Sequence, residues 1–475
     1  MSNRFSVAYG DGIGPEIMKS VLKILKHVKT DLEPEIIKIG EDTYNKGFSS
    51  GIEDDTWNVI KRNKAFLKAP LTTPLGKGYK SLNITFRRTL ELFVNICPSL
   101  SYYPFINILK KINIVIIREN EEDLYSGIEY KITPNSTIAM KLLSTFGCEK
   151  VIRYAFEYAR LNNRQRITCI TQSNIMKITE GCFQNIFFKI ASEYSSIKVE
   201  HMLADSAFAK LVTEPEHFDV IVTLNLYGDL MSKMLASVSG SVGLLGSANI
   251  GQKYAMFEAV HGSATDIAGK NIANPSGLLN AAIMMLQFLK ESKAAETIHN
   301  ALLKTIEDGL HTMDVYNAQR SKKQLTTSEF TDAIISNLGQ KPKILANQTT
   351  CVTIQNSVDR SPCRSLIISE LVGIDFFLKV NFQLELIKKL QNLDNNLPLK
   401  MVSSKGLVIW PKRLIKPKVD FYRFRFLKAD HKINISQANV LKISGQIIDL
   451  GLNIVSTVNL YKYNNKNGFT LAQGE

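Results

Sequence analysis

Short apolar runs alternate with longer amphipathic stretches along the first 340 residues of the chain. Residues 5–9 form an apolar run, and apolar side chains then recur at helical spacing from Ile17 to Val28. Further short apolar runs, separated by helical segments, lie at residues 36–39, 65–69 and 112–117. Strands that alternate with helices in this way predict an α/β sandwich for residues 1–340.

The pattern changes after residue 340. Residues 341–366 are polar and irregular, with two prolines, and this predicts a linker. Beyond it we expect a strand, a helix, a strand pair, a strand, a helix and a strand at residues 371–380, 383–393, 399–410, 421–427, 436–452 and 454–463. This order predicts a small α+β domain of the ferredoxin-like kind over residues 367–475.

Composition places the chain among globular proteins. Its 475 residues can form two or three domains, and 45% apolar and 21% charged residues are close to globular averages. No apolar run approaches the roughly 18 residues of a membrane span, and residues 1–6 lead directly into the first apolar run without a signal segment. We therefore expect a cytoplasmic protein without a membrane partner. The six cysteines are scattered, which is typical of reduced thiols rather than disulfides or zinc.

Positive charge is concentrated in the last third of the chain. Residues 341–475 carry 20 Lys and Arg against 9 Asp and Glu, so +11 of the formal net charge of +14 lies there. A basic domain can bind nucleic acid, but these residues are spread through the expected strands and helices. A solvated basic face is the better interpretation, and nucleic acid is the less favoured alternative.

One stretch between residues 72 and 87 combines the features that an anionic ligand needs. After a glycine-containing loop, Ser81 and Asn83 stand where a helix is expected to begin, beside unpaired main-chain N–H groups. Arg87 lies four residues after Asn83 on the same helix face, so its guanidinium can reach the same carboxylate or phosphate. The stretch predicts an anion-binding site; an ordinary capped helix is the alternative.

Polar side chains also follow several apolar strands, where α/β proteins usually place ligand groups. Arg118 can meet a second carboxylate, Tyr125 can donate a proton, and Lys177 can act as a base or proton relay. Asp205 and Asp229 each close an apolar strand, and two such carboxylates fit a hard divalent cation. Taken singly, each of these side chains is more simply a surface or half-buried residue.

Six stretches occur in an order that is more specific than any one of them. They are residues 10–17, 71–87, 118–125, 174–177, 225–229 and 261–275. In this order they resemble the β-decarboxylating dehydrogenases of the isocitrate and 3-isopropylmalate dehydrogenase family. The resemblance covers roughly residues 1–340, and residues 367–475 resemble the extra domain of longer bacterial members. It implies a two-subdomain sandwich of the isopropylmalate dehydrogenase kind, which forms a homodimer with sites shared between subunits.

The resemblance also implies an activity, the conversion of isocitrate to 2-oxoglutarate as in the tricarboxylic acid cycle. The small polar residues among the four expected to hold the substrate suit isocitrate better than isopropylmalate. These four are Ser81, Asn83, Arg87 and Arg118. Tyr125 and Lys177 would transfer protons, with Lys177 reaching the other subunit's site. Asp205 from the partner subunit and Asp229 would bind Mg²⁺ or Mn²⁺, which acts as a Lewis acid.

The family's dinucleotide site would be lined by Thr72, His261, Gly262, Ser263, Ala264, Asp266, Ile267 and Asn274. At the positions next to the adenosine ribose the chain has Asp266 and Ile267. A carboxylate can accept hydrogen bonds from both ribose hydroxyls but repels a 2′-phosphate. We therefore expect NAD to be favoured, with NADP as the alternative.

Two residues depart from the family pattern. Cys97 stands where the family has another substrate-binding arginine, and Lys233 stands where it has another acidic residue beside the metal. Loss of an arginine contact costs about 2 to 5 kcal/mol, and a lysine for an aspartate changes the local charge by two units. Arg88 and Lys233 are candidates to replace the lost contacts. The alternatives are therefore a catalytically impaired or non-catalytic homologue, or a dehydrogenase for a related 2-hydroxy acid such as 3-isopropylmalate or homoisocitrate.

Overall fold

The structure is a computed structural model of the chain, and it describes residues 3–74, 79–106, 111–345, 367–380, 383–411, 419–473 and 475. The chain divides into two compact units. The first comprises Met1–Ser126 and Leu142–Ser361, and the second comprises Gly127–Lys141 and Pro362–Glu475. Among the described helices, none combines the length and apolarity that crossing a bilayer would require.

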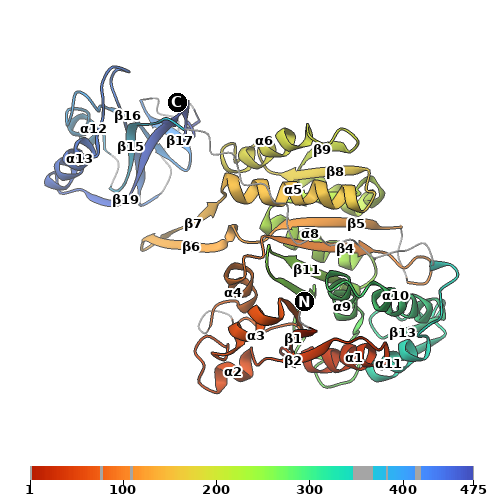
Figure 1. Ribbon diagram of the computed structural model, residues 1–475. Coiled ribbons are helices and arrows are strands. Elements are labelled where there is room, and N and C mark those ends of the chain that lie inside the picture. Colours follow the sequence, from red (N-terminus) through yellow and green to blue (C-terminus); the bar gives the residue numbers. More distant parts are fainter. Residues whose placement is uncertain are drawn as a thin grey trace. The chain divides into compact units, whose positions relative to one another are not determined.

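A ten-stranded sheet forms the centre of the first unit, in the order β2-β1-β3-β12-β11-β4-β5-β10-β8-β9 (Figure 1). Its strands are β1 (Arg4–Ala8), β2 (Glu33–Ile36), β3 (Ala65–Lys68), β4 (Val94–Leu100), β5 (Asn113–Glu119), β8 (Arg166–Thr171), β9 (Lys198–Leu203), β10 (Val220–Thr223), β11 (Gly246–Ile250) and β12 (Ala255–Ala259). Strands β2, β1, β3 and β12 are parallel to one another, as are β5, β10, β8 and β9. Antiparallel pairing of β11 and β4 joins these halves, so the halves run in opposite directions. This confirms the α/β fold with two subdomains.

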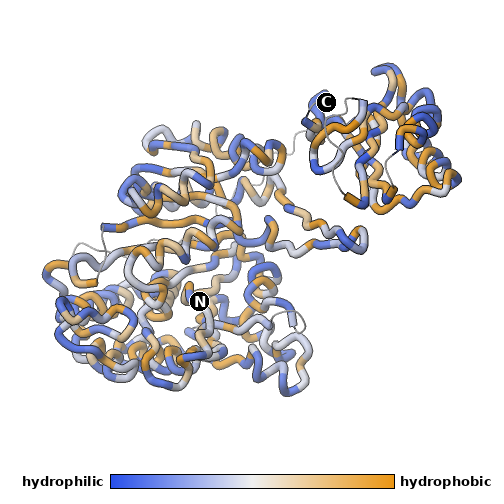
Figure 2. The backbone as a smooth tube through the Cα atoms, turned by 180° about the vertical axis from the view of Figure 1, so that it is seen from behind, coloured by the Kyte–Doolittle hydropathy of each residue, from blue (hydrophilic) through white to orange (hydrophobic). Residues whose placement is uncertain are grey.

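Helices pack against this sheet, as α5 does on β5 (Figure 1). Helix α9 packs on β12. The helices are α1 (Gly14–His27), α2 (Glu41–Asn45), α3 (Thr56–Asn63), α4 (Leu82–Thr89), α5 (Thr145–Leu161), α6 (Thr179–Ala191), α7 (Ala204–Thr213), α8 (Asn225–Val238), α9 (Ser276–Phe288), α10 (Ser292–Glu307) and α11 (Thr327–Ser336). Two 3-10 turns (Pro215–His217 and Val242–Leu244) and a small pair, β13 (Leu310–Thr312) with β14 (Lys323–Leu325), complete the unit. The tube in Figure 2 is hydrophobic along the central strands, where the largest buried cluster lies.

Two glycines after β1 allow the first turn to pack closely against distant loops. Gly10 has φ +68°, and a Cβ atom there would lie 2.2 Å from the Pro70 carbonyl oxygen. Gly12 has φ +60°, and a Cβ atom there would lie 2.0 Å from the Ser263 carbonyl oxygen. The turn after β1 can therefore approach the loops at Pro70 and Ser263 more closely than any residue with a side chain would allow.

Two elements differ from the sequence interpretation. The apolar run before Asp229 is not one long strand: β10 ends at Thr223, and Asp229 lies in the second turn of α8. Asp205 likewise lies in the first turn of α7 rather than at the end of β9. In both places the backbone turns into a helix directly after a short parallel strand, a change that an apolar composition does not reveal.

The second unit contains the predicted ferredoxin-like domain. Its antiparallel sheet has the order β17-β16-β18-β15-β19-β20. Its elements are β15 (Ser369–Lys379), α12 (Leu384–Gln391), β16 (Leu399–Ser404), β17 (Leu407–Trp410), β18 (Tyr422–Leu427), α13 (Gln437–Asp449), β19 (Asn453–Tyr463) and β20 (Lys466–Asn467). Apolar residues of α12 and α13 pack with strand residues in one core, as ferredoxin-like order requires. Residues 346–366 of the expected linker lie outside the described residues.

A hairpin that the sequence analysis did not anticipate contributes to the second unit. It consists of β6 (Asp123–Thr133) and β7 (Ser136–Leu142). The hydroxyl groups of Thr133 and Ser136 both donate to the carboxylate of Asp420, with 2.9 Å for Ser136. Strand β6 begins in the first unit and continues into the second, because the boundary between the units falls after Ser126.

The second unit also contains a buried ionic cluster, which we call the Arg425 cluster. Arg425 is 1% exposed and donates two parallel hydrogen bonds of 2.8 Å to Asp375. It also donates to Glu475 at 2.8 Å and to the Thr470 carbonyl oxygen at 3.1 Å. Its guanidinium carbon lies 4.9 Å from the centre of the Phe469 ring. All three nitrogens of this guanidinium are therefore engaged.

Candidate active site

A small charged cavity of about 160 Å³ lies in the first unit. We call it the charged cavity. Residues from β3 and the loop after it, from α4, β4, β5, α8 and β11, and from β12 and the loop after it line the cavity. They are Lys68, Pro70, Leu71, Asn83, Arg87, Asn95, Arg118, Asp229, Ser232, Lys233, Ser247, Glu258, Ala259, Val260, His261 and Gly262. The cavity thus brings together predicted substrate, metal and cofactor residues from distant parts of the chain.

Helix α4 contributes Asn83 and Arg87, as the spacing of four residues predicts. Helix α4 starts at Leu82, directly after Ser81. Ser81 itself does not line the cavity, and residues 75–78 of the preceding glycine loop lie outside the described residues. Asn83 Oδ1 and Arg87 Nε are buried without a hydrogen-bond partner. Buried polar atoms without partners are costly unless a ligand satisfies them, so both are suited to contact a bound anion.

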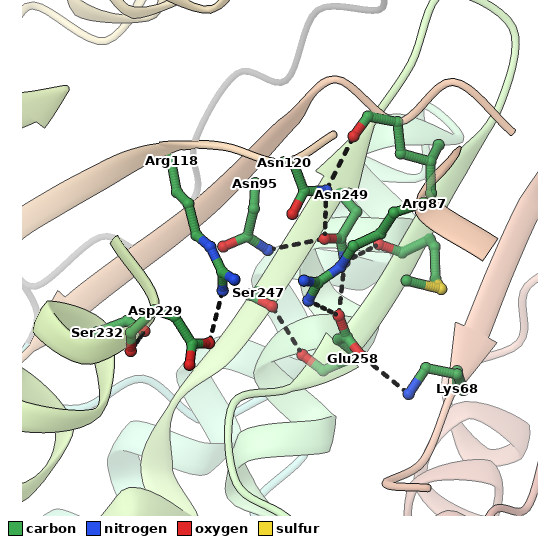
Figure 3. A network of polar contacts seen from close by, with 12 residues as sticks. Lys68, Arg87, Asn95, Arg118, Asn120, Asp229, Ser232, Ser247, Asn249 and Glu258 are labelled. Atoms are coloured by element: carbon green, nitrogen blue, oxygen red, sulfur yellow. Dashed lines mark hydrogen bonds and ion pairs between the residues drawn. The ribbon is translucent and has the colours of Figure 1, made fainter. Parts of the chain in front are cut away.

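Two buried charges, Glu258 and Lys68, lie behind Arg87 (Figure 3). Glu258 accepts a hydrogen bond from Arg87 at 3.0 Å and forms an ion pair with Lys68 at 2.8 Å. Burial alone would raise the pKa of Glu258, but Lys68 and then Arg87 lower it well below its usual range. Lys68 and Glu258 are aligned partners on the parallel strands β3 and β12. The carboxylate therefore stays ionised and fixes the Arg87 guanidinium at the cavity wall.

A second group of charges surrounds Asp229. Arg118 donates to Asp229 Oδ1 at 2.7 Å, while Lys233 and Tyr125 donate to Oδ2 at 2.7 and 2.9 Å. The side chain of Arg118 is 3% exposed, whereas that of Lys233 is 54% exposed. Burial alone would raise the pKa of Asp229, but Arg118 and then Lys233 outweigh it and hold the pKa below its ordinary value. Asp229 is therefore an ionised carboxylate whose two oxygens are both occupied.

Tyr125 is held as a protonated phenol. Burial, and then the neighbouring charge of Asp229, raises the pKa of Tyr125 to about 12. Arg118 lies over its ring, with the guanidinium carbon 5.1 Å from the ring centre. A phenol that keeps its proton at neutral pH and lies beside the cavity can donate that proton to a substrate carbanion.

The predicted dinucleotide residues lie next to the charged cavity. Thr72 Oγ1 donates to Ser263 Oγ at 3.1 Å, and the Thr72 main-chain N–H donates to Asp11 at 2.8 Å. His261 and Gly262 line the cavity itself. The Nε2 atom of His261 is buried without a hydrogen-bond partner, and burial lowers the pKa of this histidine. The imidazole is therefore neutral at neutral pH and can contact a ligand through Nε2.

Other predicted residues extend this loop region. Asn274 donates to Asp314 at 3.0 Å and accepts from the Ser276 main-chain N–H at 3.0 Å. Ala264 has φ +38° and accepts from the Ile267 main-chain N–H at 3.2 Å. Asp266 is exposed on this loop. Asn274, Ala264 and Asp266 do not line the charged cavity itself.

Several predicted residues do not reach the charged cavity. Lys177 is exposed in the turn before α6, and Asp205 is exposed in the first turn of α7, where it accepts from the Ser206 main-chain N–H at 2.6 Å. Arg88 is exposed and donates to the Tyr125 carbonyl oxygen at 2.7 Å. The expectation that Arg88 replaces the missing arginine is therefore not supported. Contribution of Lys177 and Asp205 to a partner's site remains a prediction.

Cys97 cannot supply the charge of the arginine that it replaces. It lies on β4, is fully buried, and does not line the cavity. Burial raises the pKa of this thiol to about 12, so it stays neutral. Cys97, Cys148, Cys169 and Cys182 are free thiols in the described part of the chain.

Sequence reasoning missed several residues of the cavity. Lys68 and Glu258 form the ion pair behind Arg87, and Asn249 donates to Glu258 at 2.9 Å while it accepts from Asn95 at 3.0 Å (Figure 3). The signal that could have found them was a charged or amide residue inside an apolar strand. Such a residue is rarely buried without a partner.

A divalent cation does not fit the carboxylates of this chain as they stand. Magnesium demands near-octahedral oxygen ligands, yet both oxygens of Asp229 already accept hydrogen bonds, two of them from cationic groups. No three His, Cys, Asp or Glu side chains come together as a metal site within the described ranges. The expectation of bound Mg²⁺ or Mn²⁺ therefore has no support from the geometry of one chain.

The motif order agrees with comparisons to known proteins. Residues 4–334 match the family model described as isocitrate/isopropylmalate dehydrogenase, and residues 369–475 match the one described as bacterial isocitrate dehydrogenase, C-terminal domain. The chain belongs to the isocitrate/isopropylmalate dehydrogenase family. A relative from Rickettsia bellii, named isocitrate dehydrogenase [NADP], is 48% identical, and the match covers 99% of both chains.

Two matches to Thermus thermophilus proteins extend the family assignment over the whole chain. A Thermus thermophilus relative, also named isocitrate dehydrogenase [NADP], is 38% identical, and the match covers 99% of this chain and 95% of the relative. The solved structure of the TT0538 protein, also from Thermus thermophilus, has a TM-score of 0.91 at 37% identity, and the match covers 99% of this chain and 96% of that one.

The names of these relatives contradict the expectation that NAD is favoured. The Rickettsia bellii and Thermus thermophilus relatives, which match along the full length of the chain, are both named for NADP. That expectation rested on the charge of Asp266, which is exposed in the structure. Water and salt screen an exposed carboxylate, so its charge does not decide between the two dinucleotides.

Proposed function

We propose that this protein converts isocitrate to 2-oxoglutarate and CO₂, with NADP⁺ as the hydride acceptor. The observation that carries the proposal is the charged cavity, which two guanidinium groups line beside the loops expected to hold the dinucleotide. The protonated phenol of Tyr125 donates to Asp229 of the cavity wall. The full-length likeness to proteins named isocitrate dehydrogenase [NADP] supports both the substrate and the cofactor.

In this proposal the cavity binds the carboxylates of isocitrate. Arg87 offers its unpartnered Nε, and Arg118 adds a second fixed positive charge. Bidentate contacts between guanidinium and carboxylate orient the substrate as well as bind it. Asn83, one turn before Arg87, contributes a further polar contact from the cavity wall.

The chemical steps balance without any further reactant. Hydride leaves C2 of isocitrate for NADP⁺ and the hydroxyl proton is lost. The resulting ketone then loses CO₂, and the enolate takes up one proton. Tyr125 is the donor of that proton, since its raised pKa keeps the phenol protonated until a strongly basic carbon forms. Lys177 of the partner subunit would restore the proton, which requires the homodimer.

The dinucleotide would lie along the loops that carry Thr72, His261 and Asn274. His261 is neutral and has a buried nitrogen without a partner, so it can contact the cofactor through a hydrogen bond. Asp266, being exposed, leaves room for a solvated 2′-phosphate.

The test is an assay of the purified full chain with isocitrate and NADP⁺, followed at the absorbance of NADPH and by detection of 2-oxoglutarate. Formation of both products in equal amounts is expected. 3-Isopropylmalate and homoisocitrate serve as competing substrates. Higher kcat/KM for either of them would overturn the assignment of isocitrate.

A catalytically impaired homologue is the second candidate, and buried neutral Cys97 is the observation that favours it. Such a protein would bind isocitrate but form no NADPH. Cys97→Arg together with Lys233→Asp, assayed with Mn²⁺, would then raise kcat/KM. An active wild-type chain that loses activity in this double variant would exclude the second candidate.

A further inference from the structure

Lys233 occupies the open side of Asp229. It follows Asp229 by four residues on α8, so the two side chains share one helix face. Its ammonium lies 2.7 Å from Asp229 Oδ2, while its side chain is 54% exposed. Lys233 therefore stands between Asp229 and the solvent at the entrance of the charged cavity.

The charge of Lys233 determines the net charge of the side chains that line the cavity. Four positive side chains face two carboxylates, which gives a net charge of +2; they are Lys68, Arg87, Arg118, Lys233, Asp229 and Glu258. An aspartate at position 233 would reduce this net charge to zero. One bound divalent cation would then bring it back to +2. The ammonium of Lys233 thus gives the cavity the same charge that an aspartate plus a dication would provide.

We propose that Lys233 takes the place of the divalent cation in substrate binding, so that this chain binds a hydroxy-tricarboxylate in the absence of metal. This proposal rests on the proposed function, because it concerns the same substrate and the same cavity. The ligand is isocitrate, and the Lys233 ammonium is the group that meets its carboxylate at the cavity entrance.

The donor geometry supports this role. An ammonium group has three N–H donors, and the hydrogen bond to Asp229 uses one of them. The others can bond to a carboxylate that enters the cavity. Asp229 holds the ammonium at the entrance, and Arg118 holds Asp229 from the inner side. The entering anion therefore meets a positive group whose position is already fixed.

The same arrangement works against metal binding. A dication at Asp229 would have to displace the Lys233 ammonium from Oδ2, and it would then lie beside a positive charge that remains tethered by the same helix. Arg118 would still occupy Oδ1. The positive charges of the dication and of the Lys233 ammonium would repel each other strongly, because the site is partly buried.

The first measurement uses the wild-type full chain and needs no variant. We expect the Kd for isocitrate, measured by calorimetry, to differ less than about threefold between EDTA and excess Mn²⁺. Titration of Mn²⁺ alone, followed by electron paramagnetic resonance of free Mn²⁺, should show no site tighter than millimolar. Binding that requires Mn²⁺ would overturn the proposal and leave the proposed function intact. No isocitrate binding under either condition would remove the proposed function as well.

Variants then assign the effect to Lys233. Lys233→Asp should raise the Kd for isocitrate in EDTA about 30-fold or more and create a Mn²⁺ site visible by electron paramagnetic resonance. Lys233→Met removes the charge without adding an acid, and should weaken binding in EDTA without creating that site. Lys253→Asp, an exposed lysine outside the cavity, is the matched control and should change neither measurement. Unchanged binding in both Lys233 variants would overturn the proposal.

Discussion

Both units of this protein bury arginine beside carboxylates, but they do so with opposite results. In the Arg425 cluster every guanidinium nitrogen has a partner, and the C-terminal residues Phe469 and Glu475 close over it. In the charged cavity Arg87 is held by Glu258 on one side, yet its Nε has no partner. About 160 Å³ of space remains in front of it.

The difference shows how one kind of ion pair, arginine with a carboxylate, contributes to stability in the second unit and to binding in the first. Each nitrogen of Arg425 already has a partner within the second unit, whereas Arg87 keeps one nitrogen without a partner. A guanidinium that is fixed by one carboxylate and left incomplete is ready for a second one, at the cost of a buried polar atom in the free protein. We therefore expect substitutions in the two regions to separate folding from binding.

The largest effect on folding should come from Arg425→Leu. It leaves the buried Asp375 with only Arg423, 3.7 Å away, as a counter-charge, and it removes the ion pair of Glu475. Breaking a buried ion pair in this way typically costs about 3 to 5 kcal/mol. Each unit contains one tryptophan, Trp57 in the first and Trp410 in the second, so urea unfolding of Trp57→Phe and Trp410→Phe backgrounds reports on each unit separately. Only the Trp410 signal should shift. Adding Asp375→Leu should recover part of the loss.

Arg87→Met should have the opposite effect: it should lower activity strongly and stability little. We expect kcat/KM for isocitrate to fall by about 30-fold to several thousand-fold, which corresponds to about 2 to 5 kcal/mol for a lost charged contact. Lys68 still pairs with Glu258, so unfolding of the first unit should change by less than this. Arg62→Met, an exposed arginine on α3, is the control. If Arg87→Met lowered the free energy of unfolding of the first unit but left the affinity for isocitrate unchanged, the contrast between Arg87 and Arg425 would be contradicted.

Glu119 provides a pH-dependent test beside the cavity. Burial raises the pKa of this carboxyl to about 7, although two main-chain N–H groups lower it. The folded state therefore binds more protons than the unfolded state between about pH 4.5 and 7, and the stability of the first unit should fall as pH rises through this window. Glu119→Gln cannot ionise and should remove about 1 to 3 kcal/mol of that fall. The measurement is urea unfolding of the wild type and of Glu119→Gln at about pH 5 and about pH 8, followed by the fluorescence of Trp57.

The smallest effect should come from the hairpin. Thr133→Val and Ser136→Ala each remove one hydrogen bond to Asp420 and should cost about 1 kcal/mol. The loss should appear in the Trp410 signal because the hairpin belongs to the second unit. A loss confined to the Trp57 signal would mean that the hairpin is stabilised by the first unit instead.

Much of the fold could be predicted from periodicity. The runs at 5–9, 65–69 and 112–117 became β1, β3 and β5, and the strands and helices of the second unit followed the expected order. The hairpin β6–β7 was missed although large apolar residues alternate along both strands, as Ile128, Tyr130 and Ile132 do on β6. Most of these side chains are half-buried or exposed, so the two strands do not form the continuous apolar runs that marked the buried strands. Asp205 and Asp229 were expected at strand ends, whereas both lie on helices.

The site was predicted as far as local sequence allows. Asn83 and Arg87 share one helix face, and a spacing of four residues is enough to show it. Lys68 and Glu258 are far apart in the sequence, and only the parallel register of β3 with β12 makes them partners. That register depends on packing of the whole sheet, so neither residue could be assigned a partner from its neighbours in the chain.

The path of strand β6 limits how the C-terminal domain can be exchanged between related proteins. It carries Tyr125 at its start and Thr133 at its end, and so belongs to both units. The second unit is consequently built from two separate stretches of the chain. Exchange of the C-terminal domain between relatives would have to include the hairpin at residues 127–141 as well, or else leave the hydroxyl groups of Thr133 and Ser136 without the Asp420 carboxylate.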